Sequence, residues 1–303
     1  MAKKPAPKPK KAKKAKAVDP TGVTEIDRLA DLKPCTIQDY VDGVSAYIRG
    51  QATLDAGPKK AGQIRLSNAL ARALADELTV QIPSLDGKLY THERKVAGGL
   101  RTVNADVSES HELDGLRLAV ELKPVNLAVG RAIWNRFGDI RTFAVNIHLK
   151  FPFAVVGGVL VIPTYEIKGT KAAKDAEVEE IAEEEDIDEE EAAEIAEEEE
   201  QEEQEEADDA AATATPAASV AVPAAPVRKS TVHLIEKAIE RLIRAGGRKS
   251  EAEATHLLEG IAVVVFDPDT GEIDPGLPPV GSGLRWDEFV KTIALSRSTR
   301  FED

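Results

Sequence analysis

The sequence predicts an α/β domain in which helices flank a mixed β-sheet. Apolar residues recur at helical spacing over 61–80, which predicts an amphipathic helix. Two strand-like runs follow, over 99–109 and 116–123, and the Asp114-Gly115 dipeptide between them is typical of a hairpin turn. The run 153–162 is apolar almost throughout, which predicts a strand that is buried on both faces. This mixture of helices and strands favours the α/β class.

The remaining elements follow from periodicity and from chain breakers. Residues 143–150 alternate apolar and polar side chains, which predicts a strand with one buried face. Gly138 is expected to end a helix before this strand, and Gly246-Gly247 to end a later helix. The further elements are therefore helices over 37–48, 126–137, 232–245 and 286–295, and strands over 143–150 and 260–266.

Charge is distributed unevenly along the 303 residues. The formal net charge is −15, yet residues 176–209 hold 22 acidic side chains and no Lys or Arg, while eight lysines lie in the first 16 positions. Such segments bury too little apolar surface to offset their conformational entropy, so we expect both to be disordered. The predicted organisation is a basic arm over 1–20, a folded core over 21–170, an acidic and Ala/Pro-rich linker over 171–228, and a C-terminal helix–strand–helix segment over 229–303 that packs on the core.

Both charged segments leave alternatives open. The basic arm could add a salt-sensitive attraction to phosphates or serve as a solubilising tail. The acidic segment could be an inert linker, an intramolecular competitor for a DNA groove, or a binding site for a basic partner.

Cysteine content and hydropathy indicate a soluble, cytoplasmic protein. Cys35 is the one cysteine, so no internal disulfide can form. The N-terminus has lysines but lacks the apolar stretch of a secretory signal. No apolar run reaches the roughly 18 residues that span a bilayer. The chain also has no GxxxxGK[ST] phosphate loop, GxSxG elbow or CxxC metal pair.

Three polar side chains of the predicted hairpin are expected on one face of the sheet. A two-residue turn at Asp114-Gly115 places Ser108 opposite Glu121, and Asp106 opposite Lys123. Residues two apart on a strand share a face, so Asp106, Glu121 and Lys123 converge there. The apolar residues between them face the core.

The hairpin context separates Glu121-Leu122-Lys123 from similar tripeptides. The chain has others of the [DE]xK form, among them those at 31–33, 93–95 and 166–168, and none of these three is expected to pair with an acid-bearing strand. Asp114 is nearer to this tripeptide in sequence than Asp106. At about 3.3 Å per residue, however, it lies on the order of 20 Å from Lys123.

Two carboxylates beside an ammonium group suit metal-assisted chemistry. Oxygen ligands favour hard cations, so Asp106 and Glu121 are predicted to bind Mg²⁺ or Mn²⁺. Such an ion neutralises a phosphodiester oxygen and lowers the pKa of a bound water, which Lys123 could orient or help to deprotonate. The structural alternative is an ordinary ion-pair network on an exposed sheet face.

This arrangement resembles the PD-(D/E)xK nuclease superfamily. In that family an acid on one strand precedes an apolar strand that ends in (D/E)xK, as Asp106 precedes Glu121-Leu122-Lys123 here. Ala105 stands where the family usually has a proline. The family core is a helix, a three-stranded meander, a helix and a further strand, and the predicted order over 61–162 is similar to it.

The resemblance implies a restriction-endonuclease-like fold and a metal-dependent DNA endonuclease, most similar to a type II restriction endonuclease. Asp106, Glu121 and Lys123 would be its catalytic residues, Mg²⁺ or Mn²⁺ its cofactor, and Glu77 a candidate further acid on the first helix. DNA repair and junction nucleases share this core and stay as alternatives. So do a non-catalytic DNA-binding or phage accessory protein that keeps the fold as a scaffold, and a structural interaction protein that uses its charged segments. A homodimer is compatible with these alternatives, and no membrane partner is expected.

Polar residues after the predicted catalytic strand are candidates for DNA contacts. The predicted helix 126–137 carries Arg131, Asn135 and Arg136, and the polar face of the predicted strand 143–150 carries His148 and Lys150. Phosphate contacts of this kind position a duplex without reading its sequence. A solvated surface is the alternative for each, as it is for a later basic strip formed by Lys237, Arg241, Arg244 and Arg248.

Overall fold

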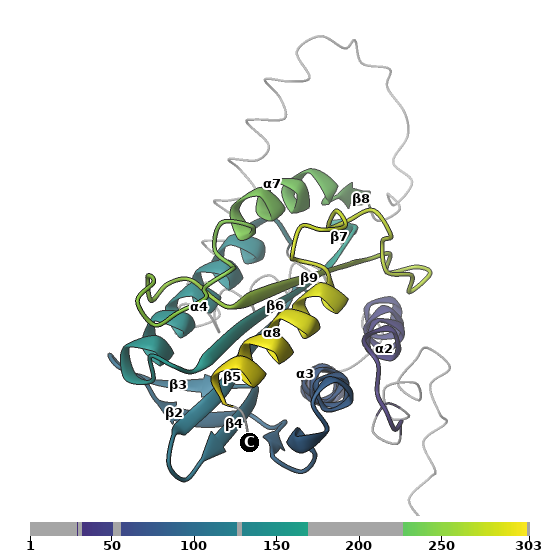
Figure 1. Ribbon diagram of the computed structural model, residues 1–303. Coiled ribbons are helices and arrows are strands. Elements are labelled where there is room, and N and C mark those ends of the chain that lie inside the picture. Colours follow the sequence, from purple (N-terminus) through teal and green to yellow (C-terminus); the bar gives the residue numbers. More distant parts are fainter. Residues whose placement is uncertain (1–28, 30–31, 51–55, 126–128, 169–226, 302–303) are drawn as a thin grey trace, which may run out of the picture.

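A five-stranded mixed sheet forms the centre of the molecule (Figure 1). The computed structural model describes residues 29, 32–50, 56–125, 129–168 and 227–301. The strands lie in the order β1 (Leu89–Tyr90), β4 (Val107–His111), β5 (Gly115–Pro124), β6 (Val155–Pro163) and β9 (Gly260–Phe266). The pairs β1–β4 and β4–β5 are antiparallel, whereas β5–β6 and β6–β9 are parallel. The predicted α/β class with a mixed sheet is therefore confirmed.

Helices cover both faces of this sheet and bury two separate sets of apolar residues. On one face, α2 (Ile37–Gly50), α3 (Ala56–Gln81) and α8 (Trp286–Arg300) pack against Leu118, Val120 and Leu122 of β5. On the other face, α4 (Val129–Lys150) and α7 (Val232–Leu242) pack with Ala119 of the same strand. A short 3-10 turn over Pro83–Leu85 follows α3, because a proline is not accommodated in the interior of an α-helix. The alternation along β5 thus sends even-numbered and odd-numbered residues to different helices.

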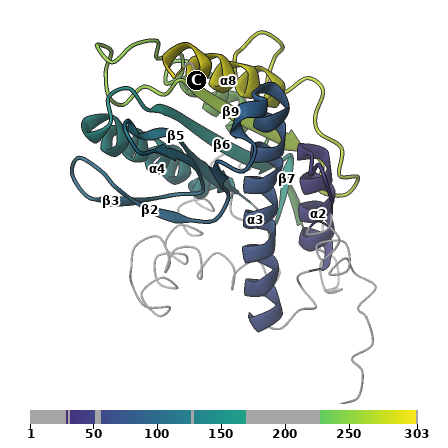
Figure 2. The same cartoon turned by 60° about the horizontal axis from the view of Figure 1, so that its bottom comes forward.

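Two small antiparallel ribbons lie outside the central sheet. One consists of β2 (Arg94–Ala97) and β3 (Thr102–Ala105), and the other of β7 (Tyr165–Lys168) and β8 (Val227–Ser230). The chain bends at Asp106 between β3 and β4, so the single strand predicted over 99–109 is two strands that belong to different sheets. Figure 2 shows the β2–β3 hairpin reaching out from the sheet beside α4.

The segment 143–150 is helical, so the strand predicted there is wrong. α4 runs through Gly138, contrary to the helix end predicted at that residue, while residues 126–128 lie outside the described residues. Buried residues recur along it at 129, 132, 133, 140, 143, 144 and 147, which is the spacing of one helix face. An alternation over eight residues is too short to separate the two periods, and packing of this face offsets the roughly 1 kcal/mol that an internal glycine costs a helix.

Glycines in β6 allow the helices on both faces to approach the sheet closely. Gly158 pairs with Glu121 of β5, and a Cβ atom at Gly158 would lie 2.4 Å from Ile140 Cγ2 of α4. A Cβ atom at the neighbouring Gly157 would lie 3.0 Å from the Phe289 ring of α8. The residues next to Ile140 in α4 are therefore held close to the strand that carries Glu121.

The C-terminal segment contributes the last strand of the central sheet. β9 spans the residues predicted for it and pairs in parallel with β6, from Gly157↔Gly260 to Pro163↔Phe266. The predicted basic arm over 1–20 and residues 171–226 of the predicted linker lie outside the described residues. Among the helices that the structure describes, none has the length and apolar character needed to cross a bilayer.

Candidate active site

The β4–β5 hairpin has a different register from the predicted one, but the same faces. Val107 pairs with Val120 and Ser108 with Ala119, so Ser108 lies two residues away from its predicted partner Glu121. The difference arises because the turn covers residues 112–114 and the register shifts between Glu109 and Ser110. An offset of two residues preserves the side of the sheet on which each side chain lies. Asp106, Glu121 and Lys123 accordingly lie near one another.

Asp106 occupies the bend at which the chain enters the central sheet. Its N–H donates to the Val120 carbonyl oxygen (3.1 Å), and its Oδ2 accepts a hydrogen bond from the Leu122 N–H (2.7 Å). The carboxylate therefore takes the place of a backbone acceptor at the end of the β4–β5 ladder. Burial raises the pKa of Asp106, although the Leu122 hydrogen bond and the charge of Lys123 act in the opposite direction.

Glu121 and Lys123 form an ion pair that is mostly buried. Lys123 Nζ lies 2.8 Å from Glu121 Oε1. The second carboxylate oxygen, Glu121 Oε2, is buried and has no hydrogen-bond partner among the described residues. Burial raises the pKa of Glu121 to about 7, with Lys123 lowering it and Asp106 raising it further. The site thus holds a carboxyl group that titrates near neutral pH.

Asp139 of α4 is a third acid beside this pair, and sequence reasoning missed it. Its Oδ2 lies 3.9 Å from Lys123 Nζ and 3.5 Å from Arg136 Nη1. The helix predicted to end before Gly138 excluded Asp139, whereas the helical spacing of buried residues through 147 would have included it. A cavity of about 280 Å³ opens between these elements, and it is lined by Arg101, Thr102, Val103, Asn104, Glu121, Lys123, Asp139 and Phe143.

The donor set at this site suits a hard cation, although it is small. Asp106 and Glu121 offer carboxylate oxygens, the ligand type that Mg²⁺ and Mn²⁺ prefer. The unpartnered Glu121 Oε2 atom is the position at which a cation would satisfy a buried charge. Within the described ranges, no group of three or more His, Cys, Asp or Glu side chains is arranged to hold a metal ion. Any ion here would therefore take most of its ligands from water.

Some of the predicted DNA-contacting residues lie at the candidate site in the structure, and others do not. Arg136 lies at the site through its contact with Asp139, and Asn135 lies beside it in α4. Arg131 is also in α4, but its side chain lies outside the described residues. Lys150 is exposed at the C-terminal end of α4 rather than on a strand that extends the site.

The prediction that His148 lies on a polar surface near the site is wrong. Its side chain is fully buried, with Nδ1 2.9 Å from the Thr255 carbonyl oxygen and Nε2 3.4 Å from Glu259 Oε2. Because residues 143–150 form a helix rather than a strand, the His148 side chain packs against Thr255 and Glu259 and does not extend the surface beside Glu121. Arg248 of the predicted basic strip is likewise buried and donates to Glu259 (2.9 Å).

The remaining acidic candidates have structural partners elsewhere. Glu77 Oε2 accepts a hydrogen bond from the Trp286 indole (2.7 Å) on the α3–α8 face, away from the α4 face that bears Glu121. Glu166 accepts from the Val129 N–H at the start of α4 (2.9 Å), and Asp114 pairs with Arg117 at the turn (2.5 Å). These contacts account for their positions without a catalytic role.

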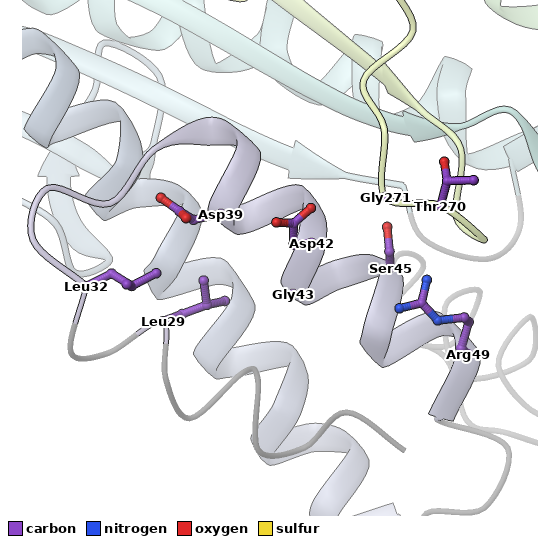
Figure 3. Close-up of a pocket in the computed structure, with 9 residues that line it drawn as sticks. All are labelled: Leu29, Leu32, Asp39, Asp42, Gly43, Ser45, Arg49, Thr270 and Gly271. Carbon is purple, nitrogen blue, oxygen red and sulfur yellow. The ribbon is translucent and has the colours of Figure 1, made fainter. Parts of the chain in front are cut away.

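A larger cavity, of about 450 Å³, lies between α2 and the turn over residues 267–271 (Figure 3). Its charged groups are already engaged in local structure. Asp42 Oδ1 accepts from Gln38 Nε2 (2.8 Å), and Arg49 Nη1 donates to the Pro268 carbonyl oxygen (3.0 Å). The Ser45 hydroxyl, which is buried there, has no hydrogen-bond partner among the described residues. No paired carboxylate and lysine line this cavity, so the smaller one is the better candidate for chemistry.

Comparison of the chain with protein-family models, with curated proteins and with solved structures returned no match. Function is therefore argued from the site itself.

Proposed function

We propose that the protein is a divalent-metal-dependent DNA endonuclease of the PD-(D/E)xK type, with Asp106, Glu121 and Lys123 as its catalytic residues. The observation that carries this proposal is the buried, unpartnered Oε2 atom of Glu121, a residue that lines the same cavity as Lys123. A buried carboxylate oxygen without a partner is unfavourable for stability. A cation that binds there during function accounts for its retention.

The order of elements supports this class of enzyme. α3 is followed by β1, β4 and β5 of the central sheet and then by α4 and β6, which is the order of the family core with the β2–β3 ribbon inserted between β1 and β4. Asp106 stands at the start of the second meander strand, and Glu121 and Lys123 stand near the end of the third. A restriction-endonuclease-like fold is therefore part of the proposal.

Each catalytic residue has a role that follows from its contacts. Asp106 and Glu121 would hold Mg²⁺ or Mn²⁺, and the Leu122 N–H fixes the Asp106 carboxylate through its Oδ2. When bound, such an ion lowers the pKa of a water ligand and neutralises charge on the scissile phosphate. Lys123 fixes Glu121 through Oε1 and lies within reach of a water or phosphate oxygen in the cavity.

The first prediction concerns cleavage. The wild-type protein should cut duplex DNA with Mg²⁺, and Asp106→Ala and Lys123→Ala should each lower the rate by on the order of 10²–10⁴-fold, because each removes a group needed at the reacting phosphate. Plasmid cleavage followed by mapping of the ends measures the rate and separates a restriction-type pattern from a repair or junction nuclease.

Asp114→Ala is the matched control, because Asp114 is an acid of the same hairpin whose partner is Arg117 at the far end of β5. It should cleave at about the wild-type rate. Cleavage at the wild-type rate by both Asp106→Ala and Lys123→Ala, with the fold intact by circular dichroism, would remove these residues from the active site.

One observation favours a second candidate, a non-catalytic DNA-binding scaffold. Asp106, Glu121 and Asp139 lie at or near the cavity, yet among the described residues no group of three acidic, His or Cys side chains is arranged to hold a metal ion. A scaffold predicts DNA binding without cleavage and no stabilisation by Mg²⁺ or Mn²⁺ that depends on Asp106 and Glu121. Metal-dependent thermal stability therefore separates the two functions.

A further inference from the structure

The β2–β3 hairpin carries positive charge and no acid. Residues 94–105 include Arg94, Lys95 and Arg101 and contain no Asp or Glu. The side chains of Lys95 and Arg101 are exposed, and neither has an ion-pair partner among the described residues. Within the described part of the chain these two charges make no ion pair that would stabilise the fold, so they are available to bind a polyanion.

The tip of this hairpin is held rigidly against α4. Asn146 Oδ1 accepts hydrogen bonds from the N–H groups of Leu100 (3.2 Å) and Arg101 (3.0 Å), while its Nδ2 donates to the Thr142 carbonyl oxygen (3.0 Å). The Gly99 N–H donates to the Asn146 carbonyl oxygen (2.7 Å), and a Cβ atom at Gly99 would lie 2.3 Å from Leu149 Cβ. The tip is therefore fixed before any partner arrives.

This rigid tip presents a large apolar side chain to solvent. Leu100 is 75 % exposed and lies between Gly99 and the exposed Arg101. An apolar side chain flanked by a basic one is the pairing with which proteins enter a DNA groove, where it packs on bases or sugars while the cation contacts a phosphate. A two-stranded ribbon also fits the width of the major groove.

The hairpin and the candidate active site share one cavity. Arg101 and the adjacent Thr102–Asn104 segment of β3 line it together with Glu121 and Lys123 of β5. A phosphate backbone held by Arg101 would thus pass beside the carboxylate–lysine pair. The base of the hairpin is fixed as well, because the Arg94 guanidinium stacks 4.4 Å from the centre of the Tyr90 ring.

We propose that the β2–β3 hairpin grips the backbone of duplex DNA and lays it across the cavity lined by Glu121 and Lys123. Arg101 and Lys95 contact phosphates, and Leu100 packs in the groove. This inference rests on the proposed nuclease function for its substrate, but it assigns binding to a different element from the catalytic strands.

The test measures binding of the full-length protein to a fluorescent DNA duplex by anisotropy, without divalent ions and over a series of salt concentrations. Arg101→Ala should reduce the slope of log K against log[salt] by about 0.9, and Lys95→Ala with Arg101→Ala by about 1.8, because each lost phosphate contact releases one fewer counterion. Lys291→Ala, which removes an exposed charge from α8 on the opposite face, should leave the slope unchanged.

A pair of leucines provides a second matched comparison. Leu100→Ala should weaken binding by about three- to tenfold without changing the salt slope. Leu113→Ala should have no effect, since Leu113 is 90 % exposed at the other hairpin tip but lies between Glu112 and Asp114. All five variants change exposed side chains, and thermal denaturation verifies that they fold.

Different outcomes overturn different claims. If Arg101→Ala and the double variant bind DNA with the wild-type affinity and slope while the wild type cleaves, the hairpin proposal is wrong and the nuclease stands. If the hairpin variants lose binding but the wild type never cleaves, the hairpin proposal stands and the nuclease is wrong. Absence of DNA binding by the wild-type protein overturns both.

Discussion

Glu121 and Glu259 are two buried glutamates whose environments shift their pKa values in opposite directions. Glu259, at the start of β9, accepts from the Val156 N–H (2.7 Å) and pairs with Arg248 (2.9 Å) and Arg300 (2.7 Å). Burial alone would raise the pKa of Glu259, but hydrogen bonds and the nearby positive charges outweigh it, and its pKa is lowered. Glu121 has one ammonium partner and a second carboxylate nearby, so burial prevails and its pKa rises to about 7.

The difference separates a structural ion cluster from a candidate active site. Both oxygens of Glu259 have partners, which lie in β6, α4, α8 and the loop before β9. One oxygen of Glu121 has none among the described residues, and Glu121 is one of the residues that line a cavity. Completed charge networks stabilise a fold, whereas an incomplete one with a perturbed pKa is typical of a functional site.

The largest expected effect comes from breaking the Glu259 cluster. Glu259→Ala should lower the free energy of unfolding by about 3–5 kcal/mol, because it leaves the buried Arg248 guanidinium without its carboxylate. Urea denaturation at pH 7 measures the change. The pKa of Glu259 is lowered in the fold. The stability that Glu259 contributes should therefore be fully present at pH values above the ordinary pKa of a glutamate, and it should be lost as the pH falls through the folded-state pKa.

If Glu259→Ala lowers the free energy of unfolding by less than about 1 kcal/mol, the Glu259 cluster does not stabilise the fold in the way proposed. Glu251→Ala is the matched control, since Glu251 is an exposed glutamate of the loop that precedes β9.

A smaller effect on stability, with the opposite dependence on pH, is expected at Glu121. The folded-state pKa of about 7 lies above the ordinary value of 4.5, so the stability that Glu121 contributes is highest below pH 4.5 and is lost as the pH rises through 7. Glu121→Gln removes this dependence. Its stability relative to wild type should therefore rise by on the order of 2 kcal/mol between pH 4.5 and 8.

Urea denaturation of Glu121→Gln and the wild type over that pH range tests this difference, and Glu251→Gln, which changes an exposed glutamate of the loop before β9, is the control. A difference that stays constant with pH would show that Glu121 has no raised pKa in the fold.

The smallest effect expected is stabilisation by metal. Mg²⁺ or Mn²⁺ at tenfold above its dissociation constant should stabilise the wild type by about 1.4 kcal/mol, and this gain should disappear in Asp106→Ala and in Glu121→Gln. Thermal denaturation with and without the ion measures it, and Asp114→Ala should retain the wild-type gain. Equal stabilisation of all four proteins would place the ion elsewhere and favour the scaffold.

The sequence predicts the faces of the β4–β5 hairpin better than its register. Parity along a strand depends on local geometry alone, so an error of two residues leaves Asp106, Glu121 and Lys123 on one side. The register itself depends on a shift between Glu109 and Ser110, where Glu109 pairs with Arg297 of α8 (2.7 Å). A partner so distant in sequence cannot be identified from the hairpin alone.

The error in α4 shows a different limit. Over eight residues, alternation and helical spacing are hard to separate, and Gly138 suggested a helix end that tertiary packing overrides. This single error removed Asp139 from the predicted site and assigned His148 to it. The partners of His148 and Arg248 converge on Glu259 through the fold, and no local pattern indicates that convergence.

Gly158 restricts how this protein can diverge during evolution. It contributes no atom to the candidate site, yet its lack of a side chain lets Ile140 approach the strand that carries Glu121, and Asp139 precedes Ile140 in the same helix. A larger residue would move this turn of α4 outward and change the distance from Asp139 to Lys123. Sequence variation in the middle of β6 is therefore limited both by the packing of Ile140 and by a distance between two charges on other elements.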